Sequence, residues 1–526
     1  MITLLDYGAG NVRSIRNAIT KLGYHVRDVS GPDDIEKASK IIFPGVGSFG
    51  SAMQVLHEKG VVEPLREHIR RGKPFLGICL GLQTLFKGSE ESPDIPGLGA
   101  IDGYVRRFDD QSLSVPHIGW NGVKQKKPSR LFAGYQGEKL YFVHSYYPII
   151  EKDSDWVLTT TDYGGEFVSG VQKGNVAAIQ FHPEKSGSAG LRILENFLAP
   201  DALTFDRVEY NPPERTRLAK RIVACLDVRA NDEGDLVVTK GNRYDVREKG
   251  SVRNLGEPVK LARRYFEEGA DEICFLNITG FRDFPLKDIP MLEVLRKTSE
   301  NVFIPLTIGG GIRGYIDSDG REYSALDVAS EYFRSGADKV SIGSDAVYEA
   351  EQFLATGKKT GRSAIEQISK VYGEQAVVVS IDPRRVYVDS PDQTPHHTIP
   401  TAEAGPNGEK YCWYQCTVKG GREGRDIDAS QLAQACEQLG AGEILLNCID
   451  RDGTNLGYDL ELTRDITQAV RIPVIASSGA GRVEHFHEVF TQTDAEAALA
   501  AGIFHRKEVS INAVKNYLRE RRVEVR

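Results

Sequence analysis

The alternation of hydrophobic and polar positions divides the chain into two regions. In residues 1–206, short apolar runs such as KIIFPG and VAAIQF alternate with segments of helical periodicity, which predicts an α/β domain with a parallel or mixed sheet. The segment 207–217 is charged, contains two adjacent prolines and lacks an apolar period, so we expect an exposed linker there. Residues 218–526 alternate more regularly and are predicted to form a second domain.

Eight strand-like apolar runs, most of them separated by amphipathic segments, occur in this second region. They lie at residues 221–227, 272–278, 302–309, 339–342, 376–382, 443–450, 472–478 and 497–501. Over about 300 residues, this pattern predicts a (β/α)8 or TIM barrel. The long polar stretch 386–413 is expected to be an inserted loop.

The predicted barrel repeats itself. GADEICFLN (269–277) matches GAGEILLN (440–447), and IPLTIGGG (304–311) matches IPVIASSG (472–479). VACLD and VVSID match as well, which places Asp227 and Asp382 at equivalent strand ends. Three matched pairs in the same order predict two half-barrels related by a two-fold repeat.

Composition narrows the class of protein. The 526 residues are 40% hydrophobic and 27% charged, with a formal net charge of −8, which is typical of a soluble globular protein and argues against a general nucleic-acid binder. No apolar run is long enough to cross a membrane, and the start, MITLLDYGAGN, resembles neither a signal nor a transit peptide, so we expect a cytoplasmic protein.

The seven cysteines are scattered and odd in number, which favours free thiols in a reducing compartment. Cys412 and Cys416 lack a second ligand pair at zinc spacing, so we expect no metal ion. No cofactor is expected either.

Cys79 stands out among the thiols because PFLGICLG runs from a buried strand into a helix with Gly77 and Gly81 on either side of it. This is the cysteine form of the nucleophile elbow G-x-S-x-G. The helix N-terminus would favour the thiolate, and the N–H of Leu80 would help to form an oxyanion hole. A lone buried cysteine is also commonly inert packing.

VAAIQFHPEKS adds the partners that such a thiol needs. An apolar strand ends at His182, and Glu184 follows two positions later. A histidine to take the thiol proton and a carboxylate to orient it complete a Cys-His-Glu triad.

At this point the sequence resembles a known family. GICLG with a later FHPE is the signature of class I glutamine amidotransferases. The motifs DYGAGN (6–11), PGVGSFG (44–50), PHIGWN (116–121) and FVHSYY (142–147) resemble the glutaminase part of imidazole glycerol phosphate synthases, and the barrel resembles the cyclase part. The fused arrangement is similar to the fungal and plant enzymes of histidine biosynthesis.

The resemblance implies roles for the N-terminal motifs. Cys79 would attack the side-chain amide of glutamine, His182 would carry protons and Glu184 would orient the histidine, giving glutamate and ammonia. The other implied residues are Gly45, Val46, Gly47 and Leu80 as oxyanion donors and Gln83, Ser145 and Tyr146 as glutamine contacts.

The barrel carries its own candidate site. Asp227 and Asp382 close strands 1 and 5, which face each other across an eight-stranded ring, so they suit general acid and base chemistry; each could instead cap a neighbouring loop. Glycine- and serine-rich strand ends bind phosphate through backbone N–H groups, and two sets half a barrel apart predict a substrate with a phosphate at each end. Those positions are Gly310, Gly311, Gly343, Ser344, Ser478, Gly479, Ala501 and Gly502.

For the barrel, the resemblance implies that ammonia adds to phosphoribulosyl-formimino aminoimidazole carboxamide ribotide. The products would be imidazole glycerol phosphate and aminoimidazole carboxamide ribotide, with Asp227 as general base and Asp382 as general acid. Further implied site residues are Lys240, Asn277, Asn447 and Asp452. Gly343 stands where many bacterial relatives carry an asparagine, so we expect a backbone contact there.

Four barrel strands begin with charged residues, namely Arg221, Glu272, Lys339 and Glu443. Strand starts are commonly solvated, but the resemblance implies that these four form an ammonia gate beneath a glutaminase docked on the bottom face. It also implies an interdomain ion pair between Lys185 and Asp338. We expect a monomer whose two domains are each other's partner, with small molecules as its only other ligands.

Two alternatives remain open. The duplicated barrel also resembles the sugar-phosphate isomerase of the same pathway, which needs no ammonia and would leave the triad unexplained. The N-terminal region could instead be a non-catalytic regulatory or docking module, with the barrel using external ammonia.

Overall fold

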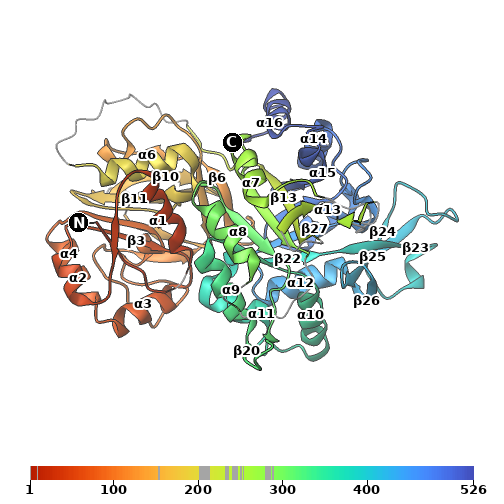
Figure 1. The fold of residues 1–526 in the computed structure, drawn as a ribbon, viewed down its shortest axis with the longest axis horizontal. Helices are drawn as coiled ribbons and strands as arrows, with labels where there is room; N and C mark the ends of the chain where they lie inside the picture. The colour runs from red at the N-terminus through yellow and green to blue at the C-terminus, as the bar shows by residue number, and fades with distance from the viewer. Residues whose placement is uncertain are drawn as a thin grey trace.

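The computed structural model describes residues 2–8, 10–151, 154–200, 214–231, 236–239, 247–248, 251–252, 254–278, 286 and 289–526. Most of the predicted linker 207–217, and Lys240, lie outside the described residues. Each region of the chain forms its own sheet, and the two regions sit side by side (Figure 1).

The N-terminal region contains an eight-stranded mixed sheet. In spatial order its strands are β2 (Val26–Asp28), β1 (Ile2–Leu4), β3 (Lys40–Gly45), β4 (Phe75–Cys79), β12 (Val176–Ile179), β11 (Glu166–Lys173), β10 (Val157–Asp162) and β7 (Lys124–Gln125). The first five are parallel to one another, and the last three join antiparallel. This is the predicted α/β class.

Helices cover both faces of this sheet. One apolar core includes α1 (Val12–Lys21) and α6 (Gly187–Leu198), and the other includes α2 (Pro32–Lys37), α3 (Phe49–Glu58) and α4 (Val62–Arg70). Two antiparallel strand pairs complete the domain. They are β5 (Tyr104–Arg107) with β9 (Tyr146–Ile149) and β6 (His117–Asn121) with β8 (Leu140–His144).

The C-terminal region forms the predicted closed parallel barrel. Its strands, in order, are β13 (Arg221–Ala230), β17 (Glu272–Asn277), β18 (Leu306–Gly309), β21 (Lys339–Ile342), β22 (Val377–Ile381), β27 (Glu443–Asn447), β28 (Val474–Ser477) and β29 (Ala497–Ala500), and β29 pairs with β13. Because β13 and β22 are first and fifth in this ring, Asp227 and Asp382 come from opposite walls.

A layer of helices surrounds the barrel (Figure 1). It consists of α7 (Pro258–Glu267), α8 (Pro290–Ser299), α9 (Ala325–Ser335), α10 (Ser344–Thr356), α11 (Ala364–Tyr372), α12 (Ala429–Leu439), α13 (Leu460–Ala469), α14 (Val483–Gln492), α15 (Gly502–His505) and α16 (Ile511–Glu520). The strand faces that point outward pack on these helices in one large core, and the inward faces form a separate small apolar cluster.

The stretch 386–413, predicted to be an inserted loop, contains strands instead. The chain there contributes to a small antiparallel sheet of β23 (Pro383–Val388), β24 (Thr398–Pro400), β25 (Tyr411–Val418) and β26 (Glu423–Asp428). This small sheet, called the inserted hairpin below, was not predicted because the residues between β23 and β25 are rich in turn formers. The alternation in YCWYQCTV is nevertheless typical of a half-buried strand. The inserted hairpin projects from the end of the barrel that lies away from the N-terminal domain (Figure 1).

The N-terminal domain docks on the face of the barrel where the strands begin. Trp120 Nε1 donates to the carbonyl of Asp271 at 3.1 Å, and the N–H of Gly187 donates to the carbonyl of Phe303 at 3.0 Å. Ser114 Oγ donates to Glu496 at 2.6 Å. Each barrel residue precedes a strand by one to three positions, so the docked face is opposite to the strand ends that carry Asp227 and Asp382.

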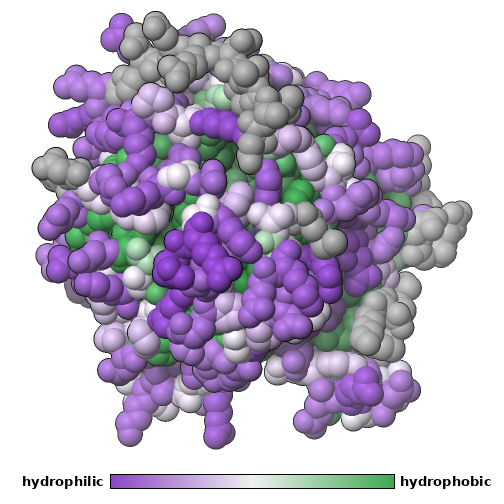
Figure 2. Space-filling model, turned by 90° about the vertical axis from the view of Figure 1, so that its left-hand side faces the viewer, coloured by the Kyte–Doolittle hydropathy of each residue, from purple (hydrophilic) through white to green (hydrophobic). Residues whose placement is uncertain are grey.

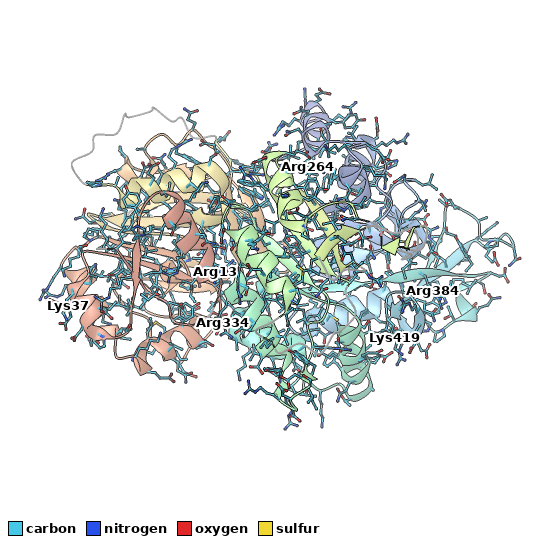
Figure 3. The ribbon with its side chains drawn as sticks, viewed as in Figure 1. Arg13, Lys37, Arg264, Arg334, Arg384 and Lys419 are labelled. Carbon is cyan, nitrogen blue, oxygen red and sulfur yellow. The ribbon has the colours of Figure 1, made fainter. Side chains whose placement is uncertain are left out.

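Figure 3 shows Arg13 of α1 and Arg334 of α9 at the junction of the two domains, where Arg13 Nε donates to the carbonyl of Arg334 at 3.1 Å. The outer side of the N-terminal domain is mostly covered by hydrophilic residues, with scattered apolar ones (Figure 2). Among the described residues, no helix is both long and apolar enough to pass through a membrane.

Candidate active sites

Cys79 stands at a sharp turn between β4 and α5 (Leu80–Gln83). Its φ of 53° lies in the left-handed region, which costs free energy for an L-residue other than glycine. Flanking glycines make the turn possible: a Cβ at Gly77 would lie 2.6 Å from the carbonyl oxygen of Gly81, and one at Gly81 would overlap the carbonyl oxygen of Phe43. The thiol is thereby held at the N-cap position of α5, directly before its first residue Leu80, as an elbow requires.

His182 and Glu184 lie beside this turn because β12 pairs with β4 in parallel, so that the two strands end at the same edge. Glu184 Oε1 is 2.8 Å from His182 Nδ1, and both side chains are buried. Burial disfavours the imidazolium, but the negative charges of Glu184 and Cys79 and the hydrogen bond to Glu184 outweigh it and raise the pKa of His182 to about 10. The arrangement thus favours a charged histidine beside the thiol.

Gln180 is a neighbour of the thiol that the sequence analysis missed. Its Nε2 atom donates a hydrogen bond to Cys79 Sγ at 3.4 Å, and the residue is fully buried. A glutamine at the buried end of an apolar strand was the available signal, because a buried amide needs a partner.

The segment Gly45–Gly47 lies against the catalytic turn. Gly45 is in register with Cys79, and a Cβ at Gly45 would lie 2.8 Å from the Cβ of Leu80. The carbonyl of Val46 accepts a hydrogen bond from the hydroxyl of Tyr7 at 2.7 Å. Gly47 has a φ of 140°, and a Cβ there would lie 2.9 Å from the carbonyl oxygen of Val371 in the barrel helix α11. The barrel therefore touches this segment directly.

Glu91, another residue not predicted, lies next to this segment. Its Oε2 atom accepts a hydrogen bond from the N–H of Phe49 at 2.7 Å. Burial raises the pKa of Glu91 to about 7, although this hydrogen bond opposes the rise. A carboxyl group that titrates near neutrality beside the elbow is a candidate functional group.

Gln83, Ser145 and Tyr146 come together at the end of β8. Gln83 Nε2 donates to the carbonyl of Tyr146 at 3.0 Å. The hydroxyl of Ser145 is buried and has no hydrogen-bond partner among the described residues, so it is available to a ligand. They lie close to the thiol, because Cys79 Sγ is 4.0 Å from the carbonyl of Val143 on the same strand.

A cavity of about 920 Å³ opens at the C-terminal ends of the barrel strands. It is lined by all the predicted catalytic and substrate-binding residues of the barrel that the structure describes, namely Asp227, Asn277, Gly310, Gly311, Gly343, Ser344, Asp382, Asn447, Asp452, Ser478, Gly479, Ala501 and Gly502. Residues from all eight strands thus meet in one chamber.

The surroundings of Asp382 change the pKa of its carboxyl group. Burial raises the pKa of Asp382, and the nearby Asp452 acts in the same direction, while a hydrogen bond from Asn447 opposes them. Asn447 Nδ2 donates to Asp382 Oδ1 at 2.9 Å, and the hydroxyl of Ser478 donates to Asn447 Oδ1 at 2.5 Å. Asp382 therefore holds a proton more readily than an ordinary aspartate does.

The glycine-rich strand ends have the tight backbone that phosphate loops need. Gly310 has a φ of 90°, and its missing Cβ leaves room for the carbonyl of Asn277. Ser478 has a φ of 76° and Gly479 one of 96°. Ser344 begins the 13-residue helix α10, whose N-terminus opens on the cavity, and such an end favours an anion.

Several cationic residues of this chamber were not predicted. They are Arg229, Arg313, Lys419, Arg422 and Arg506. Lys419 lies in the turn between β25 and β26, and its N–H donates to the hydroxyl of Ser344 at 3.0 Å; Figure 3 places it on the side of the barrel away from the N-terminal domain. In the sequence, the motif KGGR (419–422), with two glycines between two cationic residues, could have indicated a cationic turn at this cavity.

The four charged strand starts form a closed ring inside the barrel. Arg221 Nη1 lies 2.9 Å from Glu272 Oε2, and Arg221 also pairs with Glu443. Lys339 Nζ lies 2.7 Å from Glu272 Oε1 and 2.5 Å from Glu443 Oε2. All four side chains are buried, so the ring compensates two positive charges with two negative ones away from water.

Lys185 and Asp338 also meet, with Lys185 Nζ 2.6 Å from Asp338 Oδ2. Asn11 Nδ2 donates to the other carboxylate oxygen of Asp338 at 2.9 Å. One barrel carboxylate thus binds two residues of the N-terminal domain. Among the described residues, no cluster of three or more His, Cys, Asp or Glu is arranged to hold a metal ion.

Comparisons with known proteins agree with this geometry. The family model of class I glutamine amidotransferases matches residues 3–200, and the model described as histidine biosynthesis protein matches residues 221–510. The fold and the site therefore define a class I glutamine amidotransferase joined to a histidine-biosynthesis barrel.

Individual similar proteins narrow the family further than the two family models do. The chain is 59% identical over 533 residues to the chloroplastic imidazole glycerol phosphate synthase hisHF of Arabidopsis thaliana, covering 100% of this chain and 89% of that protein. It is 56% identical over 545 residues to the hisHF of Emericella nidulans, covering 100% and 98%. The subunit HisF of Methanosphaera stadtmanae is 42% identical over 309 residues, 59% of this chain and 99% of that protein. The chain belongs to the fused, bifunctional imidazole glycerol phosphate synthases of histidine biosynthesis.

Proposed function

We propose that this enzyme hydrolyses glutamine at Cys79 and consumes the ammonia in the barrel cavity. The observation that carries the proposal is the placement of two different sites on one barrel. A thiol, an imidazole and a carboxylate lie near the face where the strands begin, and a cavity with two opposed aspartates lies at the other face. The buried ring of charges lies between them.

In the first site, the Cys79 thiolate attacks the side-chain carbonyl carbon of glutamine. The oxyanion forms toward the N–H of Leu80 and the backbone of Gly45–Gly47. The His182 imidazolium, oriented by Glu184, gives its proton to the amide nitrogen, so the C–N bond breaks and ammonia leaves. Water then attacks the thioester, His182 takes its proton, and glutamate is released with the thiolate restored.

Gln83, Ser145 and Tyr146 hold the glutamine during these steps. The hydroxyl of Ser145, which has no partner among the residues that the structure describes, supports this role because a buried polar atom without a partner is costly unless a ligand supplies one.

Ammonia then passes from the first site into the barrel. The ring of Arg221, Glu272, Lys339 and Glu443 acts as the gate, and Lys185 with Asp338 holds the two domains in register over it. Above the ring the barrel interior is lined mainly by apolar residues such as Val223, Cys274 and Leu445, which favour neutral ammonia over ammonium.

In the barrel, the bisphosphorylated ribotide spans the cavity with one phosphate at each glycine-rich loop set. Ammonia adds to its ribulosyl carbonyl, and ring closure with cleavage of a C–N bond gives imidazole glycerol phosphate and aminoimidazole carboxamide ribotide. Asp382 is the general acid, which its raised pKa supports, and Asp227 is the general base. Asn277, Asn447 and Asp452 contact the substrate, and Lys240 stays a prediction outside the described residues.

We also propose domain limits of 1–206 and 218–526, a monomer, and a reducing compartment such as the cytoplasm. The described cysteines are all free and buried, which fits a reducing compartment. Light scattering on the purified chain tests the monomer directly: a mass near 58.1 kDa is expected.

Replacement of Cys79 by Ala tests the glutaminase half. Glutamine-dependent formation of imidazole glycerol phosphate should fall to background, because no nucleophile remains, while the ammonium-dependent rate should stay within about twofold. A surviving glutamine-dependent rate would refute the triad.

Replacement of Asp227 by Asn tests the barrel half. Both the glutamine-dependent and the ammonium-dependent rates should fall by about a hundredfold or more, because the general base serves both nitrogen sources. An unchanged ammonium-dependent rate would remove Asp227 from the catalytic pair.

A further inference from the structure

Two buried histidines beneath the glutaminase site have no role in the mechanism above. His117 of β6 and His144 of β8 are directly opposite each other in the antiparallel register, and their side chains are 0% and 2% exposed. His117 Nδ1 lies 3.1 Å from His144 Nε2. The pair belongs to a longer chain of hydrogen bonds.

One end of the chain is Asn121. Its Nδ2 atom lies 3.3 Å from His117 Nε2 and donates to the carbonyl of Asp162 at 3.1 Å. Its Oδ1 atom accepts the N–H of Gly122 at 2.8 Å. Since these backbone groups fix which end of the amide is NH2, Asn121 presents a donor to His117.

The other end is the carbonyl of Tyr146, which lies 2.8 Å from His144 Nδ1. A carbonyl only accepts, so His144 carries its proton on Nδ1, and Nε2 of a neutral His144 is an acceptor. His117 must then carry its proton on Nδ1, which leaves its Nε2 to accept from Asn121. If either imidazole in this series of hydrogen bonds were cationic, two N–H donors would face each other at one of its contacts.

The surroundings agree with two neutral rings. Burial lowers the pKa of His144 to about 3, against the hydrogen bond to Tyr146, and burial also holds the pKa of His117 well below its ordinary value. His117 stacks on Tyr163 with ring centroids 4.1 Å apart and on Phe142 at 5.0 Å.

The chain ends on backbone that the glutamine site uses. The carbonyl of Tyr146 accepts from both His144 and Gln83. β8 also borders the catalytic groups, because the N–H of His182 donates to the carbonyl of Tyr141 at 2.8 Å. A shift at the end of β8 would therefore move the Ser145–Tyr146 backbone relative to the triad.

We propose that Asn121, His117 and His144 form a tautomer-locked positioning relay that holds the Ser145–Tyr146 backbone in place for glutamine. These three are positioning residues: they touch no reacting atom and act through Tyr146. The inference rests on the proposed glutaminase function.

Simple packing of two aromatic rings is the competing explanation, and two variants of similar polarity separate it from the relay. His144→Asn places an amide NH2 near the position of Nδ1 and keeps a donor for the carbonyl of Tyr146. His144→Gln places its amide near Nε2, so it can accept from His117 but leaves that carbonyl one donor short.

For His144→Gln, kcat/KM for glutamine should fall about 30-fold, mainly through KM, as expected for a buried carbonyl that loses a donor. His144→Asn should stay within about fivefold of wild type. The ammonium-dependent rate of both variants should match wild type, which shows that the barrel is folded. Equal losses in the two variants, or full glutamine turnover in His144→Gln, would overturn the relay.

A spectroscopic measurement on the unaltered enzyme tests the tautomers even if a variant misfolds. In the full chain labelled with 15N at the histidine rings, His117 and His144 should be protonated at Nδ1 and unprotonated at Nε2 from pH 6 to 8. An Nε2–H tautomer or a cationic ring at pH 7 would overturn the relay. If the wild-type enzyme failed to hydrolyse glutamine, the proposed function would fail instead, and the spectra would still decide the tautomers.

Discussion

Cys79 combines an unfavourable backbone conformation with burial of its side chain. Its φ of 53° is unfavourable for a cysteine, and the residue is only 4% exposed, beside a histidine whose pKa is raised to about 10. Strain of this kind costs about 1–3 kcal/mol and persists only where the surroundings enforce it. Here β4 pairs with β3 and with β12 on either side. The stability of this sheet offsets the backbone strain at Cys79 and keeps the thiol in position.

The charge of Glu184 should control how much of the histidine is protonated. Because a raised pKa means that the imidazolium is present below about pH 10, Glu184→Gln should lower that pKa and leave less imidazolium–thiolate pair at pH 8. Alkylation of Cys79 by iodoacetamide at pH 8, followed by mass spectrometry, should slow once the pKa of His182 falls below about 8, by about tenfold for each further pKa unit lost. The exposed Glu195→Gln is the matched control; equal alkylation rates in both variants would contradict the account.

At the residue scale, the sequence predicts the parts of the site that are local patterns. GICLG and FHPE each encode a strand end and its turn, and Cys79, His182 and Glu184 meet because those ends are neighbours in a parallel sheet. Gln180, Glu91 and Tyr7 could not be assigned in this way. Their contacts with Cys79, Phe49 and Val46 arise from tertiary approach, which no spacing in the chain records.

At the scale of elements, the elbow depends on how closely α5 and β3 approach. Gly81→Ala would drive a Cβ into the carbonyl of Phe43, where backbone cannot easily give way. We expect this variant to lose glutamine-dependent activity and about 3 kcal/mol of stability of the N-terminal domain, as overpacking does. Differential scanning calorimetry measures the stability change.

Gly165→Ala is the control for that change, because a Cβ at Gly165 would meet no heavy atom within 4 Å. It should leave both activity and unfolding temperature nearly unchanged. If Gly81→Ala behaved like Gly165→Ala, the close approach of α5 and β3 would not be what shapes the elbow.

The inserted hairpin is an element whose role is visible only in the structure. Arg385 of β23 lies 2.8 Å from Asp459 Oδ2, and both side chains are almost fully buried. Asp459 caps α13, which follows the loop that carries Asp452. The hairpin thus anchors one wall of the barrel cavity, although its turn-rich sequence resembles a loop.

Arg385→Met should therefore leave a buried carboxylate unpaired, at a cost of about 3–5 kcal/mol. We expect a lower unfolding temperature of the barrel and a lower ammonium-dependent rate, both measurable on the purified chain. Arg384→Met alters the adjacent residue, which bonds Gln415 and, within the described part of the chain, no carboxylate, and should change little. Equal behaviour of the two variants would mean that the hairpin does not support the cavity.

At the scale of the whole molecule, the two sites lie at opposite faces of the barrel. Strand starts contact the glutaminase domain, and strand ends enclose the cavity, so any product of the first site reaches the second most directly along the barrel axis. The closed barrel could be predicted because its eight apolar runs are regular. The ring of Arg221, Glu272, Lys339 and Glu443 could be placed only through family resemblance, since single charges at strand starts are ordinarily solvated.

The central claim is that nitrogen passes between the two sites inside the protein, and an isotope experiment tests it most directly. The enzyme is supplied with glutamine labelled with 15N in its side-chain amide, the bisphosphate substrate and a large pool of unlabelled ammonium at neutral pH. Mass spectrometry of the imidazole glycerol phosphate then reports where the new ring nitrogen came from. We predict that it is almost entirely 15N; a label diluted in proportion to the external ammonium pool would contradict the account.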